Sequence, residues 1–347
     1  MKARFKKYIL QFKQASGTSR GILKTKETFF LQIKNENKFG IGECAIFRGL
    51  SIDDVPQYEN KLLWLCKNIN NDLAFLLNEL VEFPSIQFGL EQALLSLNSA
   101  NKFELFPSKF TSNNAQININ GLVWMGNELF MKKQIEEKLK LGFTTIKLKI
   151  GAIDFKTEYN LLKSIRKDFS VNEITLRVDA NGGFTPTNAL EKLNYLSDLE
   201  IHSIEQPIKP KQWQEMAELC LKSPLDIALD EELIGVFYKS EKQTLLNAIK
   251  PKYIILKPSL IGGFKGTNEW INLANKNNID WWITSALESN IGLNAISQYT
   301  YSLNTNLPQG LGTGSLFTNN ITSPLQVKKG SLFYNKSLNW NFDFDML

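Results

Sequence analysis

One rhythm constrains the fold of this chain more than any other feature. From residue 115 onward, a short strand-like run, a loop and an amphipathic stretch follow one another repeatedly. The strand-like runs recur at a spacing of roughly 25 to 30 residues, which is typical of strand–helix units in a parallel sheet. The runs are 115–120, 144–150, 174–180, 202–206, 226–230, 253–257, 280–284 and 309–312. Eight such units that close on themselves predict an α/β fold with a TIM-type barrel.

An open, doubly wound sheet is the competing topology. The stretches between the runs, such as 127–142, 154–169 and 186–199, carry apolar residues at helical spacing and suit either arrangement. The open sheet would be supported by a glycine-rich dinucleotide fingerprint, and the chain has none. We therefore favour the barrel.

The N-terminal third of the chain lacks this rhythm. Residues 4–14 and 27–35 alternate like an antiparallel strand pair, and helical patterns follow in 59–80 and 85–100. This combination predicts a separate α+β domain. The expected division of the chain is a capping domain with a lid loop at 1–112, a barrel at 113–318 and a tail at 319–347 that packs back on the cap.

Composition excludes several classes of protein. The chain has three widely separated cysteines and one histidine, His202, so neither a disulfide framework, a zinc site nor a two-histidine metal site is expected. The net charge of +5 comes from lysines interleaved with acids, which argues against nucleic acid as a partner but can favour a small anionic substrate. No apolar stretch approaches the roughly 20 residues that cross a bilayer. We expect a cytosolic protein with no membrane partner.

Acidic side chains end three successive predicted strands. Asp179, Glu205 and Asp230 lie at the ends of the third, fourth and fifth runs. The strand ends of a barrel meet at one face, and adjacent strands lie less than about 5 Å apart, so the three carboxylates can converge. Oxygen donors without thiol or imidazole suit Mg²⁺, with Mn²⁺ as the alternative. The acids could instead cap the helices that follow them.

Lysines end the second and sixth predicted strands. Lys147 and Lys149 are alternate residues and therefore share a face of the second strand, and Lys257 ends the sixth strand across the barrel. Two ammonium groups that face each other over a bound anion can move a proton or balance negative charge on either face of a substrate. We expect a cation and neighbouring lysines to lower the pKa of Lys149 and Lys257, and Lys147 to contact a substrate carboxylate.

Six motifs carry a resemblance to a known family. The series "KLK", "VDAN", "IEQP", "LDEE", "LKPSLIGG" and "SALES" resembles the enolase superfamily, in which lysine bases work beside Mg²⁺. The lysine pair on the second and sixth strands is similar to that of the muconate-lactonising subgroup. The resemblance covers essentially the whole chain and implies a modified (β/α)7β barrel with a capping domain.

Further segments narrow the activity that the resemblance implies. "TSRG", "GIGECA", "NGLVWMG" and "GLGTG" are similar to segments of the subgroup's dehydratases of menaquinone synthesis, which are carbon–oxygen lyases. The implied reaction is the Mg²⁺-dependent syn dehydration of a succinyl-hydroxycyclohexadiene carboxylate. Lys149 would take the α-proton and then protonate the departing hydroxide, while Lys257 would stabilise the enediolate.

The resemblance also implies supporting roles around the barrel mouth. Arg177 would assist the chemistry, and Asn181 and Glu231 would orient a metal ligand or Lys257. The far wall of the substrate pocket and the lid would be formed by Ser285, Glu288, Gly312, Thr313, Ser19 and Arg20.

Other functions remain open at this point. Racemisation of N-acylamino acids and muconate-type cycloisomerisation would use the same groups. Dipeptide epimerases of the family usually carry Asp-x-Asp on the last strand, where this chain has "GLGTG". A barrel that binds an anion without turnover is the remaining alternative, although a pure binder needs no base on each face. The oligomeric state is not indicated.

Overall fold

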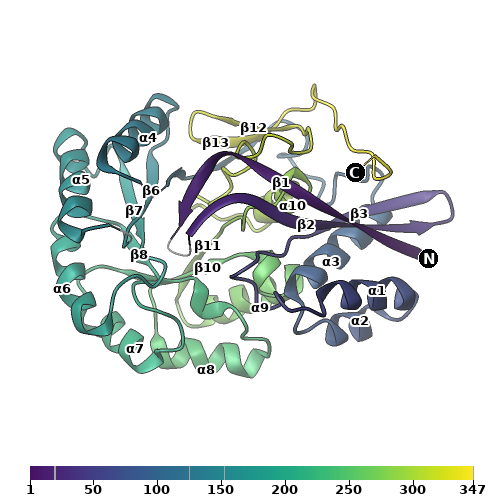
Figure 1. The fold of residues 1–347 in the computed structure, drawn as a ribbon, viewed down its shortest axis with the longest axis horizontal. Helices are drawn as coiled ribbons and strands as arrows, with labels where there is room; N and C mark the ends of the chain where they lie inside the picture. The colour runs from purple at the N-terminus through teal and green to yellow at the C-terminus, as the bar shows by residue number, and fades with distance from the viewer. Residues whose placement is uncertain (19–20, 125, 152, 347) are drawn as a thin grey trace.

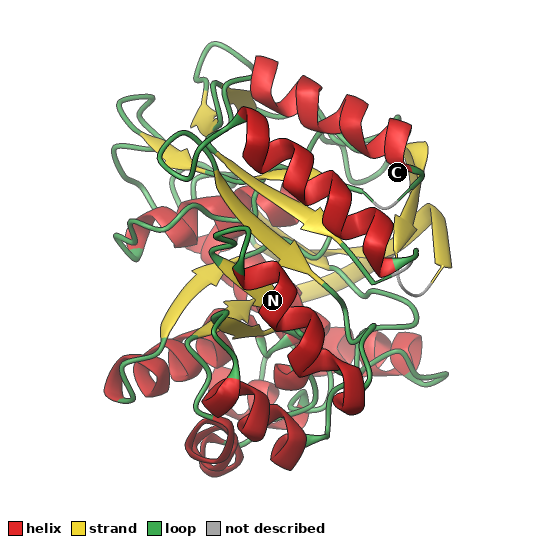
Figure 2. Cartoon of the chain, turned by 90° about the vertical axis from the view of Figure 1, so that its left-hand side faces the viewer, coloured by secondary structure: helices red, strands yellow, loops and turns green. Residues whose placement is uncertain are grey.

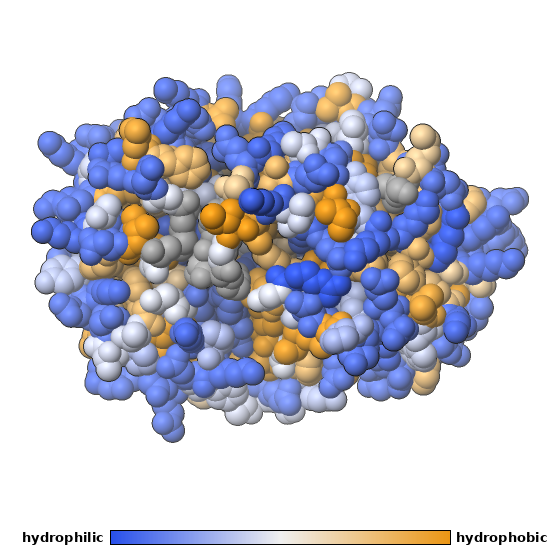
Figure 3. All heavy atoms as spheres, viewed as in Figure 1, coloured by the Kyte–Doolittle hydropathy of each residue, from blue (hydrophilic) through white to orange (hydrophobic). Residues whose placement is uncertain are grey.

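The computed structural model describes residues 1–18, 21–124, 126–151 and 153–346. It contains a modified TIM barrel and an α+β capping domain, which confirms the predicted fold class (Figure 1). Most of the face seen in Figure 3 is polar, with smaller apolar areas between the charged side chains. Within the described residues, no helix combines the length and the apolar character that crossing a membrane requires.

The cap is a three-stranded antiparallel sheet packed on helices. The sheet has the order β1 (Lys2–Thr18), β2 (Gly21–Asn35), β3 (Lys38–Cys44). The helices are α1 (Tyr58–Asn68), α2 (Leu73–Glu79) and α3 (Pro84–Asn98). The helical pattern predicted over 59–80 is split in two, because the side chain of Asp72 accepts a hydrogen bond from the backbone N–H of Ala74 and starts a second helix.

The long β1–β2 hairpin extends from the cap toward the barrel (Figure 1). Phe12 of β1 forms an antiparallel bridge with Phe317, and the N–H of Lys13 donates to the carbonyl of Leu316 at 2.8 Å. The hairpin therefore lies against the segment that follows the last barrel strand.

Seven parallel strands form the barrel sheet, in the order β11-β10-β9-β8-β7-β6-β5. They are β5 (Gly121–Val123), β6 (Thr145–Lys149), β7 (Thr175–Asp179), β8 (Ser203–Glu205), β9 (Ile227–Leu229), β10 (Tyr253–Leu256) and β11 (Asp280–Ile283). The helices lie outside the strands (Figure 2). They are α4 (Glu128–Lys140), α5 (Phe155–Asp168), α6 (Pro186–Ser197), α7 (Trp213–Lys222), α8 (Lys239–Ile249), α9 (Gly263–Lys276) and α10 (Asn290–Ser302).

The first and last predicted strands differ from the expectation. Within 115–120, β4 (Gln116–Asn118) pairs antiparallel with β13 (Ser331–Tyr334), and the barrel sheet begins only at β5. The segment 309–312 contributes parallel bridges from Gln309 to Ile119 and from Gly310 to Thr284. These bridges place it between the two edges of the sheet. The strand signal at 115–120 does not indicate that residues 116–118 pair with β13 while Ile119 pairs with Gln309.

The C-terminal tail contacts both parts of the protein. β12 (Leu325–Lys328) and β13 form a hairpin whose second strand pairs with β4. Beyond it, the ring of Trp340 stacks on Phe103, with 4.4 Å between the ring centroids, and Phe342 meets Phe30 edge to face. Aromatic pairs of this kind add to the stability that the buried apolar area already gives.

Candidate active site

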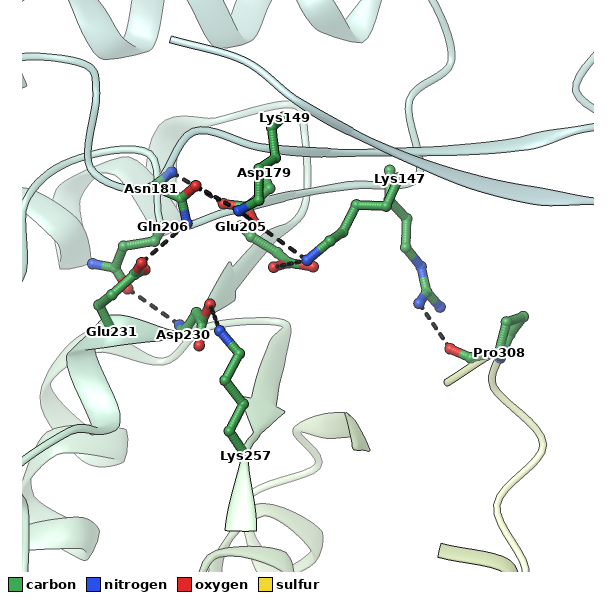
Figure 4. A network of polar contacts seen from close by, with 11 residues as sticks. Lys147, Lys149, Asp179, Asn181, Glu205, Gln206, Asp230, Glu231, Lys257 and Pro308 are labelled. Carbon is green, nitrogen blue, oxygen red and sulfur yellow. Dashed lines mark hydrogen bonds and ion pairs between the residues drawn. The ribbon is translucent and has the colours of Figure 1, made fainter. Parts of the chain in front are cut away.

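Strand register brings the acidic residues to one level of the barrel. Lys149, Asp179 and Glu205 are direct Cα partners across β6, β7 and β8, and Asp230 follows β9 immediately. One carboxylate oxygen from each of the three acids lies within 4.8 Å of the others (Figure 4). The convergence expected from the strand ends is therefore present.

The acidic cluster is buried and is incompletely satisfied by protein groups. The exposed fractions of Asp179, Glu205 and Asp230 are 1%, 0% and 2%. Among the described residues, Oε1 of Glu205 has no hydrogen-bond partner. A buried carboxylate oxygen without a donor is costly unless a cation is its partner. The cluster is thus a set of hard oxygen donors suited to a divalent metal ion.

Two lysines of β6 contact the cluster from one side. Lys147 Nζ lies 2.7 Å from Glu205 Oε2 and 3.2 Å from Asp179 Oδ2, and Lys149 Nζ lies 3.0 Å from the same Asp179 oxygen. Burial raises the pKa of Asp179, but Lys149 and Lys147 outweigh it and hold that pKa well below its ordinary value. Burial also acts on Glu205, and there it prevails over Lys147, so the pKa of Glu205 is raised.

Lys257 reaches the cluster from the opposite side. Its Nζ lies 2.5 Å from Asp230 Oδ2, and Figure 4 shows Lys149 and Lys257 approaching the acids from opposite directions. Burial lowers the pKa of Lys257, but Asp230 and Glu231 outweigh it and raise that pKa. Among the protein groups, Lys147 lowers the pKa of Lys257 as expected but does not outweigh the acids. A dication between the acids would oppose the effect of the carboxylates.

An amide and an acid position Lys149. Lys149 Nζ donates to Asn181 Oδ1 at 2.7 Å, and Asn181 Nδ2 donates to Glu231 Oε1 at 3.0 Å. Asn181 has a φ of 44°, a left-handed conformation in which Asn is more readily accommodated than most residues. The sequence analysis expected Asn181 to orient a metal ligand or Lys257. Its backbone N–H donates to Asp179 Oδ1 at 3.0 Å, and the lysine that its side chain contacts is Lys149 on β6.

Gln206 is a supporting residue that the sequence analysis missed. Its side-chain oxygen accepts from the backbone N–H groups of Asp230 and Glu232, both at 3.2 Å, and its Nε2 donates to Glu232 Oε2 at 3.1 Å. These contacts fix the backbone at Asp230. The polar residue directly after Glu205 in "IEQP" was the available signal, but only the folded arrangement reveals its partners.

A cavity of about 320 Å³ opens beside the cluster. Of the predicted site residues, its lining includes Lys147, Lys149, Asp179, Asn181, Lys257, Ser285 and Gly312. The remaining wall combines charged and polar side chains with an apolar and aromatic part. The polar part includes Lys13, Gln134, Glu137 and Lys138, and the apolar part includes Phe47, Leu50, Trp124, Phe130, Leu287 and Leu316. This apolar wall was not predicted, because it combines the cap, a barrel loop and the last segment. A cavity that joins charged groups to an apolar and aromatic wall suits a small carboxylate with a hydrophobic body.

Several predicted residues lie behind the cavity or outside the described chain. Arg177 donates to the carbonyl of Pro308 at 2.9 Å, and its guanidinium carbon lies 4.0 Å from the ring centroid of Trp282, so it packs inside the barrel. Glu288 is fully buried, and Thr313 donates to the hydroxyl of Ser285 at 2.8 Å. Ser19 and Arg20, which were assigned to the lid loop, lie outside the described residues.

The fold and the site define a class of protein. Residues 131–335 match the family described as enolase C-terminal domain-like, and this chain belongs to that family.

Some individual proteins are similar to this chain over nearly its whole length. The chain is 45% identical to the o-succinylbenzoate synthase of Desulfotalea psychrophila, over 96% of this chain and 98% of that protein. The crystal structure of MenC from the same organism matches with a TM-score of 0.86 and 42% identity, covering 96% of this chain and 99% of that one.

Two more distant proteins also match the chain, one in fold and one in sequence. The L-Ala-D/L-Glu epimerase of Bacillus subtilis, solved with substrate, matches with a TM-score of 0.83 at 18% identity over 99% of this chain and 98% of that one. The N-succinylamino acid racemase of Thermus thermophilus is 32% identical over 46% of this chain and 40% of that protein.

Proposed function

We propose that this protein is an Mg²⁺-dependent dehydratase that converts a succinyl-hydroxycyclohexadiene carboxylate to o-succinylbenzoate in menaquinone synthesis. The observation that carries the proposal is the near-full-length likeness to the Desulfotalea o-succinylbenzoate synthase. The buried acids and the opposed lysines supply the groups that such a dehydration needs.

Asp179, Glu205 and Asp230 would hold the Mg²⁺ ion. The partnerless Oε1 of Glu205 and the all-oxygen donor set fit this assignment. When bound, the ion would offset the negative charge that develops on the substrate carboxylate. Mn²⁺ accepts similar donors and is the alternative.

Lys149 would act first as a base and then as an acid. Its neutral amine takes the proton from the ring carbon that bears the carboxylate, and the C–H electron pair moves into the carboxylate to give an enediolate. The electrons then return to form a ring double bond, the bond to the neighbouring hydroxyl breaks, and the Lys149 ammonium gives its proton to the departing hydroxide. Water leaves and the ring becomes aromatic, with base and leaving group on one face.

Lys257 and Lys147 would contribute charge without carrying the proton. Lys257, on the opposite face, stabilises the enediolate as a cation. Lys147 pairs with Asp179 and Glu205, lines the cavity and would contact the substrate carboxylate. The wall at Ser285 and Gly312 would face the succinyl group, with Thr313 supporting Ser285 from behind. Ser19 and Arg20 are the proposed lid residues.

The proposal is tested by assaying two reactions with the same preparation. We expect succinylbenzoate formation to exceed racemisation of N-succinylamino acids in kcat/KM, to stop in the presence of a chelator and to return on addition of Mg²⁺. Titration with Mn²⁺ in a parallel sample compares the two cations. Dehydration that continues undiminished after complete metal removal would contradict the assignment of the acids.

N-succinylamino acid racemisation is the second candidate. It is favoured by the ammonium groups on opposite sides of the acids, because racemisation needs a proton donor and a proton acceptor on opposite faces of one carbon. Faster racemisation than dehydration would make it the main activity. The Lys257→Arg variant separates the two reactions, because arginine keeps the cation proposed for dehydration but does not exchange the proton that racemisation requires.

The contact between Asn181 and Lys149 gives a prediction of its own. We expect Asn181→Ala to lower kcat by about 10- to 100-fold, the usual cost of losing a group that orients a reacting residue. KM should change little, because Asn181 acts on the lysine. Steady-state kinetics at saturating Mg²⁺ measure both constants, with the exposed Asn160→Ala on α5 as the control. A rise in KM with unchanged kcat would instead assign Asn181 to substrate binding.

A further inference from the structure

A second group of buried charges lies where the cap sheet meets the barrel. It consists of Lys26 on β2, Glu43 on β3 and Glu288 in the loop between β11 and α10, with exposed fractions of 5%, 0% and 0%. None of the three lines the cavity beside the metal-binding acids. Within the described residues, Nζ of Lys26 has no hydrogen-bond partner. Burial lowers the pKa of Lys26, while the nearby carboxylates of Glu43 and Glu288 act in the opposite direction.

Glu43 of the cap forms hydrogen bonds with residues at the start of α10. Its Oε1 accepts from the hydroxyl of Thr28 at 2.8 Å and from the N–H of Ser289 at 2.9 Å. Its Oε2 accepts from the hydroxyl of Ser289 at 2.5 Å and from the N–H of Gly292 at 2.8 Å. Four donors therefore satisfy this carboxylate, and Lys26 is not needed to complete its hydrogen bonding.

Glu288 links two segments that border the cavity. Its Oε1 accepts from the hydroxyl of Ser259 at 2.5 Å, and its Oε2 accepts from the hydroxyl of Ser285 at 2.5 Å. Ser259 lies two residues after Lys257, and Ser285 is part of the cavity wall. The position of the Glu288 carboxylate therefore affects both the segment that follows Lys257 and the cavity wall at Ser285.

Lys26 is the positive charge in this group, and it offsets the negative charge of the two buried carboxylates. The hydrogen bonds to Glu288 come from two neutral hydroxyls, and neutral donors leave the charge of a buried carboxylate largely uncompensated. Burying Glu43 and Glu288 together would add repulsion between like charges. Lys26 lies two residues before Thr28, which bonds Glu43, and a Cβ placed on Gly292 would lie 2.9 Å from both Glu43 Oε2 and Glu288 Cβ, so the three charged residues form one cluster. Burial raises the pKa of Glu288, and Lys26 opposes that rise. Without Lys26, Glu288 would have to take up a proton or move toward solvent, and either change would alter its contacts with the two serines.

We propose that Lys26 is a positioning residue: its ammonium, contributed by the cap, balances Glu288 and thereby fixes the Ser285 wall and the segment that follows Lys257. The active site is then complete only when the cap is docked on the barrel, because Lys26 belongs to the cap and Glu288 belongs to the barrel. The inference deepens the proposed dehydratase function, and the assay below uses that reaction.

The test is a charge rescue. We expect Lys26→Met to lower kcat by about 10- to 100-fold with little change in Mg²⁺ affinity measured by calorimetry. Adding Glu288→Gln to Lys26→Met should recover most of the loss, because the glutamine keeps polar contacts to the serines and needs no counter-charge. Loss of packing alone would not be repaired by a second substitution. Lys24→Met is the matched control, since Lys24 lies two residues away on the same strand and is exposed, and it should behave as wild type.

Each outcome decides the inference. Wild-type kinetics in Lys26→Met, or a double variant no more active than Lys26→Met, would overturn it. If Lys26→Met fails to fold, a folded and active double variant supports the proposal, and a double variant that also fails overturns it. A crystal structure of Lys26→Met gives a readout that is independent of activity. We expect the contacts of Ser259 and Ser285 with Glu288 to be altered, and unchanged contacts would contradict the proposal. If the wild-type protein forms no succinylbenzoate, the proposed function fails, while this structural comparison still judges the role of Lys26.

Discussion

Turnover should fall by at least about 10³-fold when Lys149 is replaced by alanine, near the upper end of what one acid–base group contributes. Lys149 is proposed to carry the proton in both halves of the reaction. In the alanine variant, Lys147 is the remaining lysine of β6 that contacts the acids. Lys147 is held by Asp179 and Glu205, which keeps its own pKa raised and its ammonium protonated although burial opposes this. It cannot substitute as a base. Steady-state kinetics at saturating Mg²⁺ provide the measurement.

A control variant and a chemical rescue accompany the Lys149→Ala experiment. Lys156→Ala on α5 removes an exposed lysine near in sequence and should retain wild-type activity. A primary amine added to Lys149→Ala should restore part of the rate, because the deleted side chain leaves space at the cavity wall. Mg²⁺ binding should persist. A variant that keeps more than about a tenth of the activity would show that the proton is carried by another group.

The second large effect is expected from Glu205→Gln. The substitution preserves size but removes a charge from the buried cluster, so both the affinity for Mg²⁺ and the turnover should fall, the latter by about 10³-fold, given the several kcal/mol that a metal ion contributes to stabilising charge. Calorimetric titration with Mg²⁺ and kinetics over a range of Mg²⁺ concentrations separate the two effects. Excess Mg²⁺ should restore only part of the rate, because the donor itself has changed.

Two comparisons test the interpretation of this result. Glu218→Gln on α7 removes an exposed carboxylate paired with Lys222 and should alter neither Mg²⁺ affinity nor turnover. Unchanged Mg²⁺ affinity in Glu205→Gln would remove Glu205 from the metal site. The remaining pair, Asp179 and Asp230, would then need a different third donor.

The convergent acids could be predicted because they depend on rules that hold for every parallel barrel. Strand ends meet at one face, and alternate residues share a side, so Asp179, Glu205 and the pair Lys147 and Lys149 could be placed from the sequence alone. The register of β6, β7 and β8 then aligns Lys149, Asp179 and Glu205 as direct partners. No knowledge of distant contacts was needed.

Other features depend on contacts that local patterns do not encode. The strand signal at 115–120 does not specify that β4 would pair with β13, which lies more than two hundred residues further along the chain. The partner of Asn181 depends on the conformations of two loops, and the apolar wall at Trp124 and Leu316 combines segments that are distant in sequence. The sign of the pKa change at Lys257 required the actual position of Asp230.

The contacts between the β1–β2 hairpin and the segment after the last barrel strand have a consequence for biosynthesis. The bridge from Phe12 to Phe317 and the bond from Lys13 to Leu316 join segments that are far apart in sequence. During translation the β1–β2 hairpin cannot make these contacts until the segment that contains Leu316 and Phe317 has left the ribosome. Contacts of such long separation form slowly and leave strand edges open to aggregation in the meantime. We therefore expect nascent chains to depend on chaperones until this segment has emerged.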